Sequence, residues 1–276
     1  MSNLKYADRL ITDTGFESTH VMKVDQNRLK DFFSVDCTWF WRSNPNQVVD
    51  GIRISDGNQV IGLVGADPAN PFNLAGEITI WIDGEKNVLD NSSLIFVPVG
   101  VPYGPIQINH MEHPIFYTTI AIRPNPSSAM GERDPSLPRY TIISETKEKA
   151  VTPPPNTTLK GARLLHIEDD MAKGSFYVDF VWLYEGYGQA PMGIHDHEWE
   201  ELIAMTGCDP EHPYDVGGSF SIDLEGETHP INKSTLVCIP AHVMHCPWKF
   251  IEVKKPTLAF TASPSGIYYS SEKEEW

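Results

Sequence analysis

Residues 65–108 read GADPANPFNLAGEITIWIDGEKNVLDNSSLIFVPVGVPYGPIQI, and residues 207–250 read GCDPEHPYDVGGSFSIDLEGETHPINKSTLVCIPAHVMHCPWKF. The two stretches align without a gap at one constant offset. Glycine, aspartate and proline recur at equivalent places near the start of each copy: Gly65, Asp67, Pro68, Pro71 and Gly76 match Gly207, Asp209, Pro210, Pro213 and Gly218. The chain therefore contains an internal duplication.

Each copy consists of short alternating or apolar runs separated by turn residues. The clearest runs are Ile78–Ile82 and Leu94–Val97 in the first copy, and Phe220–Leu224 and Leu236–Ile239 in the second. Asp83-Gly84 and Glu225-Gly226 are typical of tight hairpin turns. Short antiparallel strands at this spacing predict an all-β fold, either a sandwich or a barrel.

The duplication predicts three parts of the chain. Residues 1–123 form an N-terminal module and residues 161–276 a C-terminal module. Residues 124–160 are rich in proline, serine and threonine, which predicts a linker. One further strand is expected in this linker, near Tyr140–Ile143.

Charge and composition exclude several classes of partner. The formal net charge is −16, which argues against nucleic acid and against an anionic membrane surface. Residues 1–23 lack the apolar core of a signal peptide, and the sequence has no run of about eighteen apolar residues that would span a membrane. We therefore expect a cytoplasmic protein with a small-molecule partner.

The cysteines agree with a reducing compartment. The chain has four, with no CxxC pair and no framework spacing: Cys37, Cys208, Cys238 and Cys246. They are expected to be free thiols. Because neighbouring residues of a strand point to opposite faces, Cys246 is expected to face away from the site to which His245 contributes.

The second copy contains residues that suit a metal ion. His195 and His197 are two residues apart and Glu201 follows after an even step, so all three would share one face of an extended strand. His245 follows the turn at IPAHVMH, on a strand that a barrel brings alongside. Three imidazoles and one carboxylate suit one Fe, Mn, Ni, Co or Zn ion, with coordination positions left for substrate.

In these motifs the sequence resembles the cupin superfamily, in which HxH followed three residues later by Glu is the first metal motif and PxGxxH the second. The resemblance covers the chain as two tandem modules, a bicupin. It implies two cupin-type (jelly-roll) barrels, with the metal site only in the C-terminal one. It also implies a homo-oligomer, with a dimer favoured.

Two departures from the family pattern stand out. The glycine of PxGxxH is His242 here, although the first copy keeps it as Gly100. If this position requires a positive φ, histidine fits it less well than glycine. The asparagine that often follows the second motif in the family is absent here. Separately, the first copy has lost the metal ligands, whose positions are taken by Arg53, Ser55, Gln59 and Tyr103. That module is either a structural half or an anion site built on Arg53.

The sequence also offers candidates beyond the metal ligands. The general base is open among His242, Tyr184 and Glu200. Trp182, Trp199 and Met205 could line the substrate pocket, although any of them could equally be plain core. Glu200 could replace Glu201 as the carboxylate ligand, but its parity places it on the outer face of a strand.

Three functions remain open, because barrels of this kind catalyse many different reactions and the fold alone does not determine which one. The first is a dioxygenase-type oxidoreductase that acts on an enolisable or aromatic metabolite. The second is a non-redox lyase, isomerase, decarboxylase or hydrolase in which the metal is a Lewis acid. The third is a non-catalytic protein that binds a metal or metabolite. The common occurrence of the three-histidine, one-glutamate set in cupin dioxygenases favours the first.

Overall fold

The computed structural model describes residues 4–12, 20–25, 27–29, 32–54, 56–67, 69–122, 138–145 and 157–265. Within these ranges the chain is built from β-strands, and its one helical element is the 3-10 turn η1 (Ala7–Arg9). Among the described residues no helix has the length and apolar character needed to cross a bilayer. The all-β fold class predicted from the sequence is confirmed.

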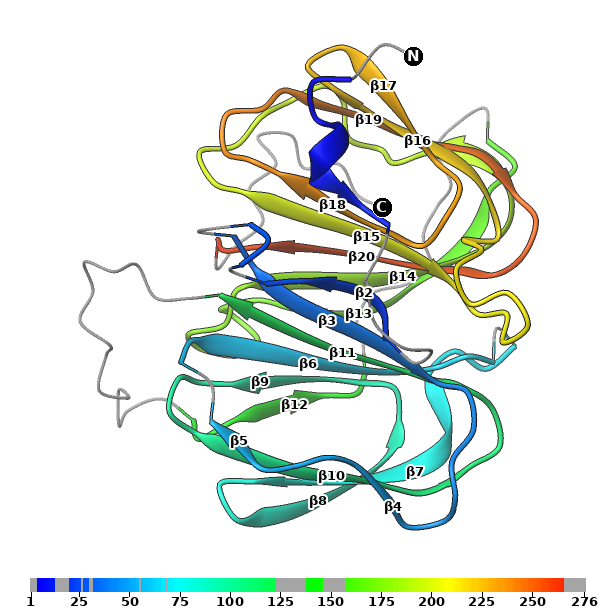
Figure 1. The fold of residues 1–276 in the computed structure, drawn as a ribbon. Helices are drawn as coiled ribbons and strands as arrows, with labels where there is room; N and C mark the ends of the chain where they lie inside the picture. Colours follow the sequence, from blue (N-terminus) through cyan, green and yellow to red (C-terminus); the bar gives the residue numbers. More distant parts are fainter. Residues whose placement is uncertain are drawn as a thin grey trace.

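The N-terminal unit consists of two sheets that face each other (Figure 1). One has the order β12-β9-β6-β11-β3-β2, and the other has the order β4-β10-β7-β8 with β5 also on β10. The strands of this unit are β2 (His20–Val24), β3 (Ser34–Phe40), β4 (Gln47–Asp50), β5 (Arg53–Ile54), β6 (Asn58–Gly65), β7 (Asn73–Ile82), β8 (Glu85–Asn91), β9 (Ser93–Val97), β10 (Pro102–Met111), β11 (Ile115–Ile122) and β12 (Thr141–Ile143).

The C-terminal unit is one curled sheet of nine strands with the order β1-β18-β15-β20-β14-β19-β16-β17, in which β13 also pairs with β14. The long strand β14 closes the curl, because its first part pairs with β20 and its end pairs with β19. The strands are β1 (Leu10–Ile11), β13 (Lys160–Ile167), β14 (Tyr177–Gln189), β15 (Glu201–Gly207), β16 (Gly218–Leu224), β17 (Glu227–Ile231), β18 (Thr235–Ile239), β19 (His245–Val253) and β20 (Thr257–Ser263).

The two copies of the repeat fold alike. The hairpins β7–β8 and β16–β17 occupy equivalent places, and so do the pairs β6–β9 and β15–β18. Both hairpins turn through two residues with positive φ: 51° and 81° at Asp83 and Gly84, and 51° and 79° at Glu225 and Gly226. Such pairs match the right-handed twist of the flanking strands.

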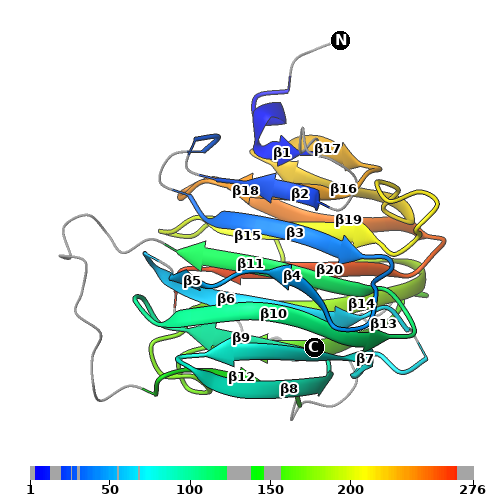
Figure 2. The same cartoon turned by 60° about the horizontal axis from the view of Figure 1, so that its bottom comes forward.

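Two short strands, β12 and β1, lie at the edges of their sheets. The strand expected near Tyr140–Ile143 is present as β12, which pairs with β9 and so extends a sheet of the N-terminal unit. The rest of the expected linker lies largely outside the described residues. Strand β1, near the start of the chain, pairs with β18 of the C-terminal sheet (Figure 2). The first described residues therefore contribute to the second unit.

A shared apolar core joins the units. Phe116 on β11 packs against Phe260 on β20 with ring centroids 6.1 Å apart, and Phe260 stacks on Phe180 at 4.7 Å. Trp39 is fully buried beside them and donates its indole N–H to Thr206 Oγ1 at 3.1 Å. The burial of these large rings away from water stabilises the contact between the six-stranded sheet of the N-terminal unit and the sheet of the C-terminal unit. Each barrel keeps a separate apolar interior of its own.

Candidate metal centre

The predicted ligands come from two strand ends and the loop between β14 and β15. Glu201 is the first residue of β15, and His245 is the first residue of β19. The expectation that His195 and His197 lie on an extended strand continuous with Glu201 is wrong, because residues 196–200 form no strand. His195 is instead held by an isolated bridge to His245, in which each residue donates its backbone N–H to the other's carbonyl.

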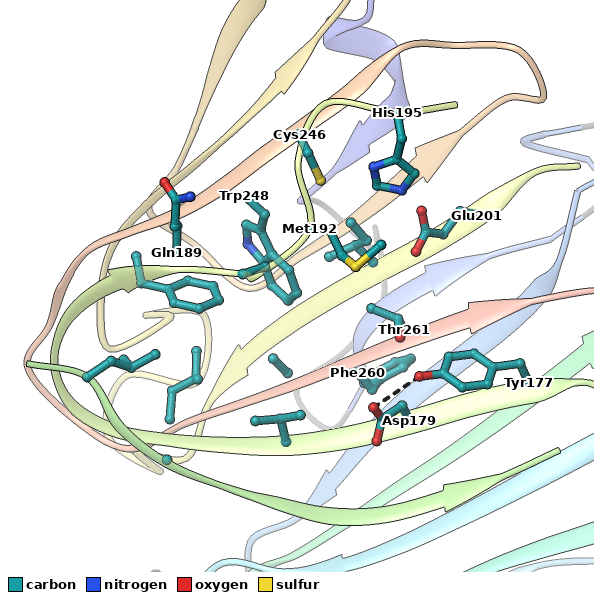
Figure 3. A pocket seen from close by; sticks show the side chains of 18 residues that line it. Tyr177, Asp179, Gln189, Met192, His195, Glu201, Cys246, Trp248, Phe260 and Thr261 are labelled. Carbon is teal, nitrogen blue, oxygen red and sulfur yellow. Dashed lines mark hydrogen bonds between the residues drawn. The ribbon is translucent and has the colours of Figure 1, made fainter. Parts of the chain in front are cut away.

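This arrangement brings the four side chains together. One ligand atom from each of His195, His197, Glu201 and His245 lies within 4.8 Å of the others, so the group could hold a metal ion. His245 Nε2 is 2.9 Å from Glu201 Oε2, and His197 Nε2 is 3.5 Å from the same oxygen. Figure 3 shows the His195 ring and the Glu201 carboxylate directed toward one another. The convergence comes from the loop and the bridge rather than from strand alternation.

Backbone carbonyls set the tautomer of two of the imidazoles. His195 Nδ1 lies 2.7 Å from the Gly193 carbonyl oxygen, and His245 Nδ1 lies 2.8 Å from the Val243 carbonyl oxygen. A carbonyl only accepts, so each Nδ1 carries the proton and donates it, which leaves a lone pair on each Nε2. Histidine ligands of metal sites are commonly oriented in this way.

Three of the converging atoms have no hydrogen-bond partner among the described residues, although they are buried: His195 Nε2, His245 Nε2 and Glu201 Oε2. With Nδ1 protonated, His245 Nε2 and Glu201 Oε2 are two acceptors 2.9 Å apart, and they repel each other unless a cation lies between them. A metal ion between the two atoms removes this repulsion, and so does a second proton on His245.

The pKa values of Glu201 and His245 also reflect the close approach of their two side chains. Burial opposes charge on both groups, yet the imidazoles of His197 and His245 hold the pKa of Glu201 at about 2. Glu201 in turn raises the pKa of His245 against the effect of burial. Burial lowers the pKa of His195. The site thus keeps its carboxylate ionised, and a metal ion that binds there would displace the proton shared with His245.

The loop before His245 keeps the backbone of its glycine-containing counterpart. His242 has a φ of 61° and Gly100 has a φ of 77°, so both repeats place a left-handed residue at this position. Histidine therefore takes the left-handed conformation that glycine has at this position of the other repeat. The His242 side chain is 70% exposed, and its Nδ1 is 4.0 Å from Asp196 Oδ2.

A cavity opens beside the ligands inside the C-terminal barrel (Figure 3). Its volume is about 90 Å³, which is room for several waters or a small organic molecule. Its wall is mostly apolar and is formed by Leu159, Val181, Leu183, Ala190, Met192, Ile203, Trp248, Phe250 and Ala259, together with Phe260. His195 and Glu201 line one part of it.

Cys246 also lines this cavity, which corrects the expectation that it faces away from the site. The residue has a φ of 74°, and the pairing of β19 with β16 shifts its register between Ile222 and Leu224. These two irregularities break the strict alternation of side chains along the strand. Burial, reinforced by the charge of Glu201, raises the pKa of the Cys246 thiol to about 12, so it stays protonated.

The other predicted site residues lie elsewhere. Trp182, Met205, Trp199, Tyr184, Glu200 and His242 are all absent from the described lining of the cavity. Trp182 is fully buried in the core shared by the two units, because the neighbours Val181 and Leu183 take the cavity face of β14. Trp199 instead stacks on His197, with ring centroids 5.2 Å apart, and so supports a proposed ligand.

Tyr184 and Met205 have different surroundings. Met205 is fully buried in the apolar interior of the C-terminal barrel. Tyr184 is half-buried at the edge of the shared core, where burial and the charge of Asp67 raise its pKa to about 12. Glu200 lies outside the cluster of converging ligand atoms. None of the residues considered as a general base therefore lines the cavity.

The structure adds polar residues that the sequence reading missed. Asp179 lines the cavity and accepts two contacts of 3.0 Å from Arg163 Nε and a hydrogen bond of 3.1 Å from Tyr177. Burial raises the pKa of Asp179 despite Arg163. Trp248 also lines the cavity. The signal for Asp179 was present, because an acidic residue inside an otherwise apolar strand requires a buried partner.

The equivalent positions of the N-terminal barrel are closed by hydrogen bonds. Gln59 and Tyr103, which replace Glu201 and His245, bond each other at 2.9 Å through Gln59 Nε2 and the phenol oxygen. Arg53 pairs with Asp50 at 2.8 Å and is more than half exposed. Ser55, the counterpart of His197, lies outside the described residues.

Comparison with known proteins supports the fold. No protein-family model and no curated protein sequence matches the chain. Among solved structures, a single-residue mutant of Bacillus subtilis oxalate decarboxylase matches with a TM-score of 0.58 and 10% identity, over 92% of this chain and 75% of that one. A protein of Pseudomonas aeruginosa described as glyoxylate-induced matches with a TM-score of 0.54 and 13% identity, over 99% and 87%.

A third structure, AerE from Microcystis aeruginosa, matches with a TM-score of 0.54 and 12% identity, over 93% of this chain and 99% of that one. At such identities the likeness concerns the fold alone. Together with the curled sheets described above, it shows that the chain has the all-β cupin barrel fold.

Proposed function

We propose that the C-terminal barrel binds one divalent transition metal through His195, His197, Glu201 and His245, and that the chain is a metal-dependent enzyme for a small oxygenated metabolite. The observation that carries this proposal is the convergence of four ligand atoms within 4.8 Å, two of them buried acceptors that face each other. Three nitrogen donors and one carboxylate suit Mn, Fe, Co, Ni or Zn.

The cavity defines what the protein itself would contribute. Its apolar walls exclude water and hold the carbon skeleton of a substrate, while the bound metal would supply Lewis acidity or, with iron, reactivity toward O₂. Asp179 is the lining carboxylate that lies outside the ligand set. We assign it the acceptance of a proton from an enolisable substrate, with Arg163 and Tyr177 fixing its orientation.

Two reaction classes follow for this site. The set of three histidines and one glutamate beside a mostly apolar cavity suits an enolisable or aromatic substrate and supports a dioxygenase-type oxidoreductase, which we place first. A non-redox reaction such as decarboxylation is the second candidate, and the likeness to the fold of oxalate decarboxylase supports it. Consumption of O₂ separates the two classes.

Metal analysis of the purified chain tests the first step. We expect about one transition metal ion per chain, lost in the double variant His195→Ala/His197→Ala. The matched control is His110→Ala/His113→Ala, which removes two exposed histidines of the N-terminal unit and should keep its metal. Absence of metal from the wild-type chain after reconstitution with each candidate ion would refute the proposal.

The reaction class is tested on the reconstituted chain. Anaerobically prepared protein containing Fe²⁺ is exposed to O₂ with a panel of 1,3-dicarbonyls and catechols. Uptake of O₂ that depends on a panel member supports the dioxygenase. Product formation without O₂ uptake supports the non-redox class. In either case Asp179→Asn should reduce turnover while leaving metal content unchanged, and a variant with full turnover would exclude Asp179 as the proton acceptor.

A further inference from the structure

We propose that the substrate of this site is a mainly apolar molecule with at most one negative charge, and that it offers an oxygen acceptor to the indole N–H of Trp248. The inference rests on the proposed function, because the same molecule would place its oxygen donors on the metal. It adds the class of substrate and one residue that recognises it.

The size and wall of the cavity set the first condition. Aliphatic and aromatic side chains from four strands and two loops surround the space, and Trp248 packs edge-to-face on Phe250 at 5.0 Å. In Figure 3 the Met192 side chain lies, in this view, between Trp248 and the Glu201 carboxylate. A substrate bound at the metal would therefore have carbon rather than charge next to most of its surface. Burial of apolar groups here contributes affinity in proportion to their area.

Charge balance sets the second condition. The described lining of the cavity includes no lysine or arginine. Arg163, which contacts the lining residue Asp179, is already paired with that carboxylate. With neutral imidazoles, a divalent ion and Glu201 together carry one positive charge. A monoanion neutralises it, whereas a dianion leaves an uncompensated negative charge in an apolar cavity, which is strongly unfavourable.

The third condition comes from an unused donor. Trp248 is 7% exposed and lines the cavity, and its Nε1 atom is buried with no hydrogen-bond partner among the described residues. A buried indole N–H normally finds an acceptor. The backbone of Trp248 is fixed by a bond of 2.8 Å from the Ala190 N–H to its carbonyl oxygen. A carbonyl, ether or hydroxyl oxygen of the substrate would satisfy this donor.

Together these conditions disfavour oxalate as the substrate of this chain. Oxalate is a small dianion without carbon surface for the apolar wall. The enolate of an aryl-substituted 1,3-dicarbonyl satisfies the charge and surface conditions, because it combines two oxygen donors, one negative charge and an apolar ring. A further oxygen on that ring would supply the acceptor for Trp248.

Binding to the metal-loaded full chain tests the charge and surface conditions. The probes are benzoylacetone, acetylacetone and oxalate, titrated calorimetrically with metal content checked before and after. We expect benzoylacetone to bind about 10-fold more tightly than acetylacetone, because burial of its phenyl ring adds apolar contact, and oxalate to bind more weakly than benzoylacetone. Equal binding of the two diketones, or tighter binding of oxalate, would overturn the inference while leaving the metal site intact.

The role of Trp248 is tested with Trp248→Phe, which keeps an aromatic ring and removes the N–H. The probes are benzoylacetone and its 4-methoxy and 4-acetyl derivatives. We expect affinity for the derivative that the wild type prefers to fall roughly 3- to 10-fold, as for the loss of one hydrogen bond. Metal content should not change.

The matched control is Trp81→Phe in the N-terminal unit, which should bind every probe like the wild type. If Trp248→Phe also binds every probe as tightly as the wild type, Trp248 does not recognise the substrate. Loss of metal from the unmodified chain would instead count against the proposed function itself, so the two failures are distinguishable.

Discussion

Glu201 Oε2 at the start of β15 and His245 Nε2 at the start of β19 lie 2.9 Å apart, and the equivalent pair in the N-terminal barrel, Gln59 and Tyr103, lies at the same separation. The first pair consists of two acceptors, whereas the second consists of an amide and a phenol that can each donate and accept. The pair Glu201 and His245 can therefore bind a cation, whereas Gln59 and Tyr103 satisfy each other with a hydrogen bond. This contrast explains how one fold carries a candidate metal centre in only one of its two copies.

Removal of the metal should therefore destabilise the chain, because Glu201 and His245 would lose the cation between them. A ligand present at 100 times its dissociation constant stabilises the folded state by about 2.7 kcal/mol. For a protein of this size we expect a chelator to lower Tm by roughly 5–10 °C. Differential scanning calorimetry with and without chelator measures the shift.

The variant Glu201→Gln should have a Tm that the chelator does not change, because the charged ligand is gone. The variant Gln59→Ala removes the equivalent side chain of the N-terminal barrel and should keep the full chelator shift. A shift retained by Glu201→Gln and lost by Gln59→Ala would place the metal in the other barrel.

A second prediction concerns the contact between the two units. Trp39 donates to Thr206 across the shared core, and Thr206 also accepts from Ser234 at 3.2 Å. Replacing Trp39 by Phe removes the bond and part of the ring, with an expected loss of about 1–3 kcal/mol of unfolding free energy. Urea denaturation of Trp39→Phe, Thr206→Val and the double variant gives the coupling energy. Additive effects would mean that the two side chains do not interact.

The sequence was sufficient to predict the repeat, the hairpins and the four residues that converge. It could not predict how they converge, because residues 196–200 leave the strand and an isolated bridge to His245 takes its place. The position of Cys246 was missed for a related reason, since alternation fails where φ is positive and the register shifts. Local irregularities of this kind depend on tertiary contacts that a periodic pattern does not contain.

The cavity was harder still to predict. Trp182 and Met205 were reasonable lining residues from their size, but only the curl of the sheet decides which face of a strand turns inward. Asp179 shows the opposite case. A carboxylate in an apolar strand predicts a buried partner, yet Arg163 on β13 could be identified as that partner only from the pairing of β13 with β14.

A third prediction concerns His242, which holds a φ of 61° where the other repeat has glycine. A left-handed conformation costs a non-glycine residue about 1–2 kcal/mol, so His242→Gly should leave stability unchanged or raise it by up to about 1 kcal/mol after the entropic cost of glycine. The side chain is exposed and lies outside the cavity lining, so metal content and turnover should stay at the wild-type level. A loss of turnover in a stable, metal-loaded variant would restore His242 as a catalytic residue.

The last prediction concerns pH and the buried thiols. Burial raises the pKa of Cys238 from its ordinary value of 9.0 to about 12, and burial raises that of Cys37 as well. Above pH 9 the unfolded chain loses these protons while the folded chain keeps them, so the unfolded state binds fewer protons and stability falls as pH rises. Each thiol contributes a slope of about 1.4 kcal/mol per pH unit between its two pKa values.

Unfolding free energies of wild type, Cys37→Ala and Cys238→Ala, measured between about pH 7 and 11, test this dependence. Each variant loses packing at every pH, so the difference in slope rather than in stability carries the information. We expect the alkaline slope of each variant to be shallower than that of the wild type. Other groups that ionise in this range, such as tyrosines, cancel in the comparison. Parallel curves for wild type and Cys238→Ala would show that this thiol ionises as readily in the folded chain as in the unfolded one, and that its burial does not oppose charge.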